Sequence, residues 1–285
     1  MHKYFILFPN FNPIIFSFGM FSFHWYGLMY FLGLIFAIWS GKKFAKKNKK
    51  YWLEKETVNI LYICFIGMII GGRLGYIFLY DFFYYSNNLL ECLKIWKGGM
   101  SFHGGLIGIV ITIFLFSKKN KKNFLEMLDF ITPLAPFGLG IGRIGNLING
   151  ELWGKINVNS PIYIFFPASK KIDLKILQTR PELQSIFDQF GNLPRYPSQI
   201  YEFFFEGIIL FILLNYFKNK KKPVGNISGI FLIYYGIIRF VLEFFREPDI
   251  QLGLFYNYIS MGQILSIPML IIGIITLMYS KKMSK

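Results

Sequence analysis

Two arginines stand out because they occur in or at the end of long apolar stretches of the sequence. Arg143 ends one such stretch, and Tyr235, Arg239 and Glu243 follow one another at four-residue spacing in another. In a helix this spacing puts the three side chains on one face. Arg239 and Glu243 alone would equally fit a structural ion pair. Arg143 favours a ligand, because two buried arginines with few obvious carboxylates suit phosphate oxygens.

His103 is the candidate for acid–base chemistry. It follows Ser101-Phe102 and precedes Gly104-Gly105 at the expected start of a helix. An isolated histidine is more often structural than catalytic, but near a phosphate site it can accept a proton close to neutral pH. His24 has no such context, and we expect it to be a packing residue.

Several other chemistries lack their residues in this sequence. It contains no Walker lysine motif, no HExxH, no aspartate dyad and no GxSxG elbow. Cys64 and Cys92 have no partners at metal-ligand spacing and are interpreted as packing residues. We therefore expect neither a metal site nor a cofactor.

The composition is that of a membrane protein. Of 285 residues, 54% are hydrophobic and 20% aromatic, although the net charge is +16. Soluble domains rarely combine these features, whereas membrane proteins confine basic residues to loops, where they set orientation and bind anionic lipid headgroups. We expect membrane lipid, and no nucleic acid, as a partner.

Hydropathy predicts an all-α integral membrane protein that forms a single membrane domain over residues 1–285. Crossing the hydrocarbon core takes roughly 20 apolar residues in a helix. Pro9 and Pro13 and the lack of a small-residue cleavage site argue against a removable signal peptide. A small extracytoplasmic head is expected over 155–199, with a β-like run at Ile162 to Phe166. The seven predicted transmembrane helices are about 17–40, 58–79, 100–116, 124–141, 200–217, 226–245 and 258–279.

Lysine clusters predict the orientation in the membrane. By the positive-inside rule all of them face the cytoplasm, which places the N-terminus outside, the C-terminus inside and the head outside. The protein is then expected to span a membrane that borders the cytoplasm. The clusters are Lys42 to Lys55, Lys118 to Lys122, Lys218 to Lys222, and Lys281, Lys282 and Lys285.

Polar residues of the predicted spans converge on the outer leaflet, while Glu126 and Asp129 are near the cytoplasmic face. Pro133 and Pro136 are expected to kink the fourth span, and the glycines from Gly138 to Gly145 to unravel its outer end. Small residues at GxxxG spacing are expected to pack helices closely. The residues placed in the outer half are His24, Tyr26, Arg73, His103, Arg143, Glu202, Glu206 and Arg239.

The run from Gly142 to Gly154, Gly-Arg-Ile-Gly-Asn-Leu-Ile-Asn-Gly-Glu-Leu-Trp-Gly, resembles the signature of bacterial prolipoprotein diacylglyceryl transferases. Three further stretches are similar to the same family: 101–105, 197–202, and 235–239 with 246–248. Leu147 and Tyr196 depart from the pattern, which commonly has Phe and His at these positions. The first change conserves packing, and the second puts a polar role for position 196 in doubt.

The resemblance implies transfer of the diacylglyceryl group of phosphatidylglycerol to the lipobox cysteine of a preprolipoprotein signal peptide, with release of glycerol phosphate and formation of a thioether. It implies that Arg143 and Arg239 stabilise the leaving phosphate and that His103 activates the thiol. The other residues it carries over would position the headgroup, line the cavity, bind substrate or permit close backbone approach; they are Tyr26, Asn146, Glu151, Gly154, Glu202, Tyr235 and Glu243.

Two rival interpretations remain open at this point. In a lipid or anion transporter the two arginines would bind phosphate in the outer leaflet without chemistry, but polar residues should then continue through the inner half of the spans. In a membrane scaffold the buried charges would be structural, which does not explain the dense run over 142–154.

Overall fold

The computed structural model describes residues 4–19, 21–47, 53–94, 98–159, 162–220, 223–248, 253–255 and 258–283. Parts of the predicted basic clusters lie outside these residues, namely 48–52, 221–222 and Lys285. The same holds for the loop positions 95–97, 249–252 and 256–257. The chain is mostly helical and divides into two compact units. Unit 1 comprises Met1–Gly33, Pro136–Phe211 and Ile237–Pro248, and unit 2 comprises Leu34–Ala135, Ile212–Gly236 and Asp249–Lys285.

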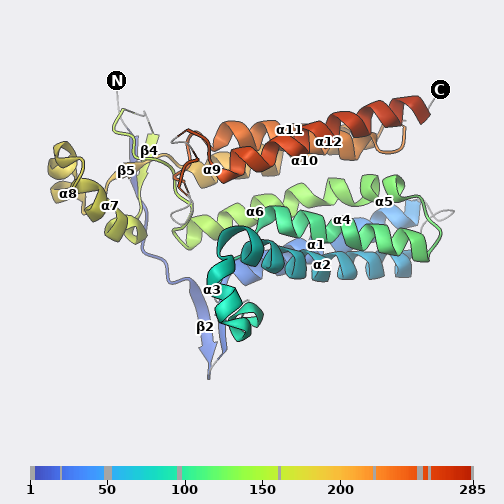
Figure 1. Cartoon of the computed structure of the whole chain (residues 1–285), viewed down its shortest axis with the longest axis horizontal. Coiled ribbons are helices and arrows are strands. Elements are labelled where there is room, and N and C mark those ends of the chain that lie inside the picture. The colour runs from blue at the N-terminus through green and yellow to red at the C-terminus, as the bar shows by residue number, and fades with distance from the viewer. Residues whose placement is uncertain are drawn as a thin grey trace. The chain divides into compact units, whose positions relative to one another are not determined.

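Figure 1 shows the helices and strands of the chain. Four helices contribute residues to both units: α1 (Trp25–Lys47), α6 (Ala135–Ile148), α10 (Leu210–Lys218) and α11 (Asn226–Leu242). The other elements of unit 2 are α2 (Glu54–Tyr80), α3 (Phe82–Asn87), η1 (Leu89–Leu93), α4 (Phe102–Lys119), α5 (Phe124–Ile131), η3 (Thr132–Leu134) and α12 (Met261–Met283).

Unit 1 contains short strands as well as helices. Strand β4 pairs in parallel with β1 and antiparallel with β5, and β2 and β3 form an antiparallel hairpin. Its elements are β1 (Tyr4–Leu7), β2 (Ile14–Phe18), β3 (Phe21–His24), β4 (Ile162–Phe165), η4 (Pro167–Ser169), α7 (Lys170–Leu177), η5 (Pro181–Leu183), α8 (Gln184–Phe190), β5 (Pro194–Arg195), α9 (Ser198–Glu202) and the π-helical turn η6 (Phe203–Ile209).

Six helical segments of the described chain are long and apolar enough to cross a membrane. They match six of the predicted spans, while the helix at 226–242 is apolar but shorter, with 17 residues. The six are Trp25–Lys47, Glu54–Tyr80, Phe102–Lys119, Phe124–Ile148, Ser198–Lys218 and Met261–Met283.

The expected start of the first span is wrong. Residues 14–18 and 21–24 form the two strands of the β2–β3 hairpin, and the helix begins only at Trp25. Serine and phenylalanine alternate here, a two-residue period that suits a strand, and aromatic residues favour strands. The strict all-α description is corrected by this hairpin and by the sheet of β1, β4 and β5, where the β-like run at 162–166 is confirmed as β4.

The expected unravelling of the fourth span is also wrong. The chain tightens into the 3-10 turn η3 at Pro133, but α6 then continues without a break to Ile148. Two of the four glycines, Gly140 and Gly145, allow close packing. A Cβ on Gly140 would lie 3.1 Å from the Cα of Gly207, and one on Gly145 would lie 3.1 Å from the Tyr26 ring.

The GxxxG prediction is confirmed inside unit 2, where α2 packs directly against α4. A Cβ on Gly75 would lie 2.6 Å from the Cα of Gly104, too close for any side chain. The core of this unit contains Ile60, Leu61, Cys64, Ile113, Phe116, Met127, Phe130 and Leu134.

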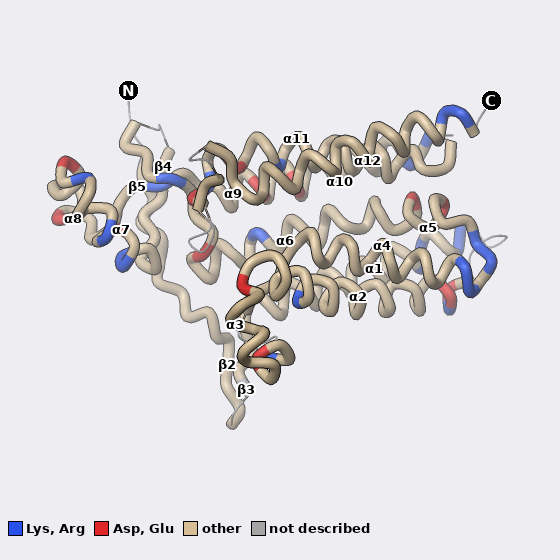
Figure 2. Tube along the Cα trace, viewed as in Figure 1, with Lys and Arg blue, Asp and Glu red and all other residues tan. Residues whose placement is uncertain are grey.

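The basic ends of the helices of unit 2 gather together (Figure 2). Lys122, after α4, lies 2.6 Å from Glu56 at the start of α2. Lys218, at the end of α10, lies 4.5 Å from the ring centroid of Phe44 near the end of α1. These contacts put lysines from separate predicted clusters at the same end of one helical unit.

Candidate functional site

Arg143 lies among glutamates of the segment 198–209, which follows β5. Its Nη2 lies 2.8 Å and its Nε 3.1 Å from Oε2 of Glu206, and its Nη1 lies 3.3 Å from Oε2 of Glu202. Only 12% of the Arg143 side chain is exposed, and both glutamates are fully buried. Arg143 comes from α6, Glu202 from α9 and Glu206 from η6.

Arg239 on α11 contacts the carboxylates of the same two residues, Glu202 and Glu206. Its Nη1 lies 2.7 Å from Oε1 of Glu202 and 3.8 Å from Oε1 of Glu206, and its Nη2 lies 2.8 Å from Oε2 of Glu243. Arg239 is thus paired with the glutamate one turn later, as the four-residue spacing allows. Arg246, to which the sequence analysis assigned no role, brings its Nη1 within 3.5 Å of Oε1 of Glu202.

These six residues, which we call the arginine–glutamate cluster, are Arg143, Arg239, Arg246, Glu202, Glu206 and Glu243. Three formal positive charges meet three negative ones. An unpaired charge away from water costs several kcal/mol, so each charge of the cluster stabilises the burial of the others. Glu202 touches all three arginines and is the centre of the cluster.

The expectation that the arginines have few carboxylates beside them is wrong. Glu202 and Glu206 come from a segment distant in sequence from Arg143 and Arg239, and the pairing depends on how the chain folds back. One local signal could have revealed it. The four-residue spacing of Glu202 and Glu206 puts both carboxylates on one helical face, as the spacing of Arg239 and Glu243 does.

The π-helical turn η6, which contains Glu206, packs closely against α6. Such turns often occur at functional sites. Here Gly207 of η6 faces Gly140 of α6 so closely that a Cβ on Gly207 would lie 2.8 Å from the Cα of Gly140. This approach of two glycine backbones brings Arg143, three residues after Gly140, within reach of Glu206.

The signature segment after α6 is held by amide groups. Glu151 accepts hydrogen bonds through its Oε1 from Nδ2 of Asn146 at 2.9 Å and Nδ2 of Asn149 at 3.3 Å. Its backbone carbonyl accepts another from Nε2 of Gln199 at 2.8 Å. Asn146 is buried one turn after Arg143. Glu151 is thus a fourth glutamate close in sequence to Arg143, but its hydrogen-bond partners are neutral amides.

Gly154 lies where two other backbone segments approach it. Its amide donates to the carbonyl of Tyr196 at 3.2 Å, and it forms an antiparallel bridge with Arg246. A Cβ here would lie 2.5 Å from the Tyr196 carbonyl oxygen and 2.8 Å from that of Phe245. No residue larger than glycine fits without a shift of backbone.

Tyr26 lies in the first turn of α1 and belongs to the same unit as the cluster. Its hydroxyl lies 3.1 Å from that of Tyr30, and a Cβ on Gly145 of α6 would lie 3.1 Å from its ring. Tyr26 therefore packs next to the residue that precedes Asn146.

His103 and Tyr235 belong to unit 2, whereas the cluster belongs to unit 1. His103 is the second residue of α4, whose N-cap Ser101 accepts a hydrogen bond from the amide of Gly104. Phe102 links the two residues, because it stacks on Tyr235 at 4.7 Å between ring centroids and meets the His103 ring edge-on at 5.3 Å.

Arg73, which the sequence placed in the outer half, binds backbone carbonyls in the described part of unit 2. Its guanidinium donates to the carbonyls of Cys92 at 2.9 Å, Gly98 at 2.6 Å and Glu91 at 2.6 Å. It therefore anchors the segment after α3. The packing role predicted for Cys64 agrees with its burial in the core of unit 2.

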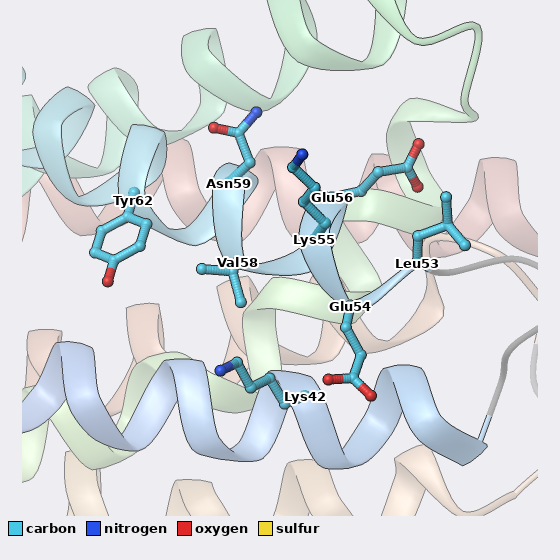
Figure 3. A pocket seen from close by; sticks show the side chains of 8 residues that line it. All are labelled: Lys42, Leu53, Glu54, Lys55, Glu56, Val58, Asn59 and Tyr62. Carbon is cyan, nitrogen blue, oxygen red and sulfur yellow. The ribbon is translucent and has the colours of Figure 1, made fainter.

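A groove of about 760 Å³ lies between the last part of α1 and the start of α2 (Figure 3). It belongs to the lysine-rich end of unit 2, and no residue predicted for the site lines it. Its lining residues are Lys42, Leu53, Glu54, Lys55, Glu56, Val58, Asn59 and Tyr62.

Comparison with known proteins gives one consistent result. The model of the prolipoprotein diacylglyceryl transferase family matches residues 13–279. A protein of Buchnera aphidicola subsp. Acyrthosiphon pisum (strain APS) is 56% identical over 281 residues, which cover 99% of this chain and all of that protein. Proteins of Escherichia fergusonii and Escherichia coli O1:K1 / APEC are 49% and 48% identical over 285 residues, covering all of this chain and 98% of each relative. All three are named phosphatidylglycerol–prolipoprotein diacylglyceryl transferase.

Proposed function

The chain belongs to the prolipoprotein diacylglyceryl transferase family, and from this premise we propose that the arginine–glutamate cluster and the signature segment form its active site. It is an enzyme that transfers the diacylglyceryl group of phosphatidylglycerol to prolipoproteins, a step of lipoprotein maturation in the membrane. The observation that carries the assignment of the site is the burial of Arg143 and Arg239 on shared carboxylates in otherwise apolar helices.

The reaction exchanges one bond to a glycerol carbon for another. The thiol sulfur of the lipobox cysteine forms a C–S bond to the glycerol carbon that carries the phosphate. The C–O bond to that phosphate breaks, its electron pair leaves with glycerol phosphate, and the thiol proton passes to a base. The developing negative charge is on the phosphate, so groups that stabilise that charge lower the barrier.

Arg143 and Arg239 are proposed to supply this stabilisation. A guanidinium has five N–H donors in a planar fork, so it can bind phosphate oxygens while it keeps part of its carboxylate contacts. Glu202 and Glu243 hold Arg239 in place, and Glu202 and Glu206 hold Arg143. Donors that are already oriented need little reorganisation when the phosphate arrives.

The proposed roles of the signature residues follow from their contacts. Asn146, one turn after Arg143, donates a hydrogen bond to Glu151, and both are proposed to position the lipid headgroup. Gly154 is proposed to permit the close approach of the backbones on either side of it. Tyr26, packed on α6, is proposed to line the lipid cavity.

His103 and Tyr235 are assigned by the family resemblance. His103 is proposed as the base that takes the thiol proton, and Tyr235 as a second residue of the cavity wall. A free cysteine thiol has a pKa near 8.5, so removing its proton is a modest demand on a histidine.

The apolar helices make this a multi-pass membrane protein. We propose seven spans, with α11 as the short one, a single membrane domain over 1–285 with a head insertion at about 155–199, and the inner membrane of a bacterium as the location. Lysines gathered at one end of unit 2 support a cytoplasmic position for that end, hence an extracytoplasmic N-terminus and head.

The test uses purified protein in vesicles that contain phosphatidylglycerol, with a synthetic lipobox peptide. We expect a peptide mass increased by one diacylglyceryl group, with glycerol phosphate released in equal amount. Vesicles of phosphatidylethanolamine alone, and a peptide with serine in place of the lipobox cysteine, are the controls that should give no product. Binding of phosphatidylglycerol without any thioether product would reject the transferase and favour the lipid or anion transporter.

A further inference from the structure

Three separate parts of the chain meet in a joint next to the arginine–glutamate cluster. The segment 152–156 lies between the segments 194–199 and 245–247. On one side Gly154 donates to the Tyr196 carbonyl at 3.2 Å and Tyr196 to the Lys155 carbonyl at 3.1 Å. On the other side Lys155 donates to the Phe245 carbonyl at 2.9 Å and Glu247 to that of Trp153 at 3.2 Å.

Each segment of this joint continues a helix that carries a charge of the cluster. The segment 152–156 follows α6 with Arg143, the segment 194–199 leads into α9 and η6 with Glu202 and Glu206, and the segment 245–247 follows α11 with Arg239. The hydrogen-bond register of the joint therefore fixes the ends of these three helices against one another.

Arg195 ties the joint together through its side chain. Its Nη1 donates to the Gly154 carbonyl at 3.0 Å and to Oε2 of Glu247 at 3.1 Å, and its Nη2 donates to Oδ1 of Asp173 at 2.6 Å. The guanidinium also lies 5.5 Å from the ring centroid of Trp153. Arg195 is fully buried, so it cannot exchange these partners for water.

Asp173 anchors Arg195 in the head. The Oδ2 of Asp173 accepts hydrogen bonds from the Ser169 hydroxyl at 2.6 Å and the Leu193 amide at 3.0 Å, which leaves Oδ1 for Arg195. One guanidinium thus connects the head to the signature segment and to the segment that carries Arg246 and Glu247.

We propose that Arg195 is a positioning residue for the transferase reaction. Its side chain binds Gly154 and Glu247 and so fixes the position of Arg246 and of the end of α11. Arg246 in turn keeps Glu202 aligned between Arg143 and Arg239. Arg195 does not touch the substrate. This inference rests on the proposed function, because it concerns the rate of that reaction.

The test compares Arg195→Lys with wild-type protein in the vesicle assay, measuring kcat and KM for phosphatidylglycerol together with the thermal midpoint. Lysine keeps the charge but cannot bind three partners with a planar fork. We expect kcat to fall by about tenfold or more, because small misplacements of groups that act in the transition state are costly, with KM within about twofold. Arg180→Lys, at an exposed head arginine paired with Glu182, is the matched control and should keep full turnover.

A second variant covers the case in which Arg195→Lys does not fold. Glu247→Gln keeps size and an acceptor oxygen at a side chain that is 30% exposed, and removes only the charge that Arg195 binds. We expect a smaller loss of kcat, about threefold or more, at an unchanged thermal midpoint. Combined with Arg246→Lys, the two losses should be less than multiplicative, because both act on the same alignment.

The outcomes separate the two proposals. Absence of thioether product from the wild-type protein would refute the proposed function itself. With an active wild type, normal kcat in folded Arg195→Lys, or in Glu247→Gln where Arg195→Lys does not fold, would overturn the positioning role. Losses that multiply fully with Arg246→Lys would overturn it as well.

Discussion

At the residue scale, the proposed site is a group of charged side chains, and each charge compensates the burial of its neighbours. Glu202 bonds to three arginines, and each of Arg143 and Arg239 bonds to more than one carboxylate. The sequence placed Arg239 and Glu243 on one helical face, since spacing within one helix is visible in a sequence. It did not predict the partnership of Arg143 with Glu206, which depends on contact between residues 63 positions apart.

Gly154→Ala is expected to destabilise the protein and remove activity. The new methyl group would overlap the carbonyl oxygens of Tyr196 and Phe245, which belong to hydrogen-bonded backbone and cannot move aside cheaply. Overpacking of this kind costs about 1–3 kcal/mol. Gly138→Ala is the control, because a Cβ there meets nothing within 4 Å and alanine favours the helix. Thermal unfolding of both variants in detergent measures the difference, and equal midpoints would contradict the steric explanation.

At the element scale, polar side chains fix the ends of apolar helices. Asp129 of α5 accepts hydrogen bonds at Oδ1 from the Ser228 amide at 2.8 Å and hydroxyl at 2.6 Å, and at Oδ2 from the Gly225 amide at 2.7 Å. It thereby caps the start of α11 from a neighbouring helix. Sequence reasoning placed Asp129 near the cytoplasmic face but could not identify this role, since its partners are 96 and 99 residues away.

Asp129→Ala is therefore expected to lower the free energy of unfolding by about 1–3 kcal/mol, because buried amides of the α11 start lose their acceptors. Glu126→Ala on the same helix, at an exposed position, should change it by less than about 0.5 kcal/mol. Denaturation of the two variants in the same detergent makes the comparison. A similar loss for both would show that Asp129 does not act as a cap.

At the scale of the whole molecule, the sequence predicted the apolar helices well because span length and hydropathy are local properties. It failed where local patterns compete. Residues 14–24 are apolar enough for a span, yet alternating aromatic residues form the β2–β3 hairpin before Trp25. The glycines of α6 suggested a loop, but they lie within the helix, and two of them, Gly140 and Gly145, leave room for Gly207 and Tyr26.

Topology is tested with single cysteines in a background of Cys64→Ala and Cys92→Ala, which we expect to stay active because the reacting thiol belongs to the substrate. Asn120→Cys should be protected from a membrane-impermeant thiol reagent in intact cells, and Gln178→Cys should be labelled. Asn120 lies beside the lysines after α4, and Gln178 follows α7 in the head. Labelling at 120 with protection at 178 would invert the orientation and move the site to the inner leaflet.

The most direct measurement of the central claim, that diacylglyceryl transfer takes place at the arginine–glutamate cluster, is the turnover of Arg143→Lys at saturating phosphatidylglycerol, beside its thermal midpoint. Lysine keeps the charge opposite Glu202 and Glu206 but loses the fork that clamps two phosphate oxygens. Losing a contact that counts most in the transition state should cost on the order of 3 kcal/mol, a rate loss of roughly a hundredfold or more, at a nearly unchanged midpoint. Arg73→Lys is the matched control, a buried arginine bonded to backbone carbonyls, whose turnover should change no more than its stability does. Turnover of Arg143→Lys close to that of the wild-type protein would contradict the claim.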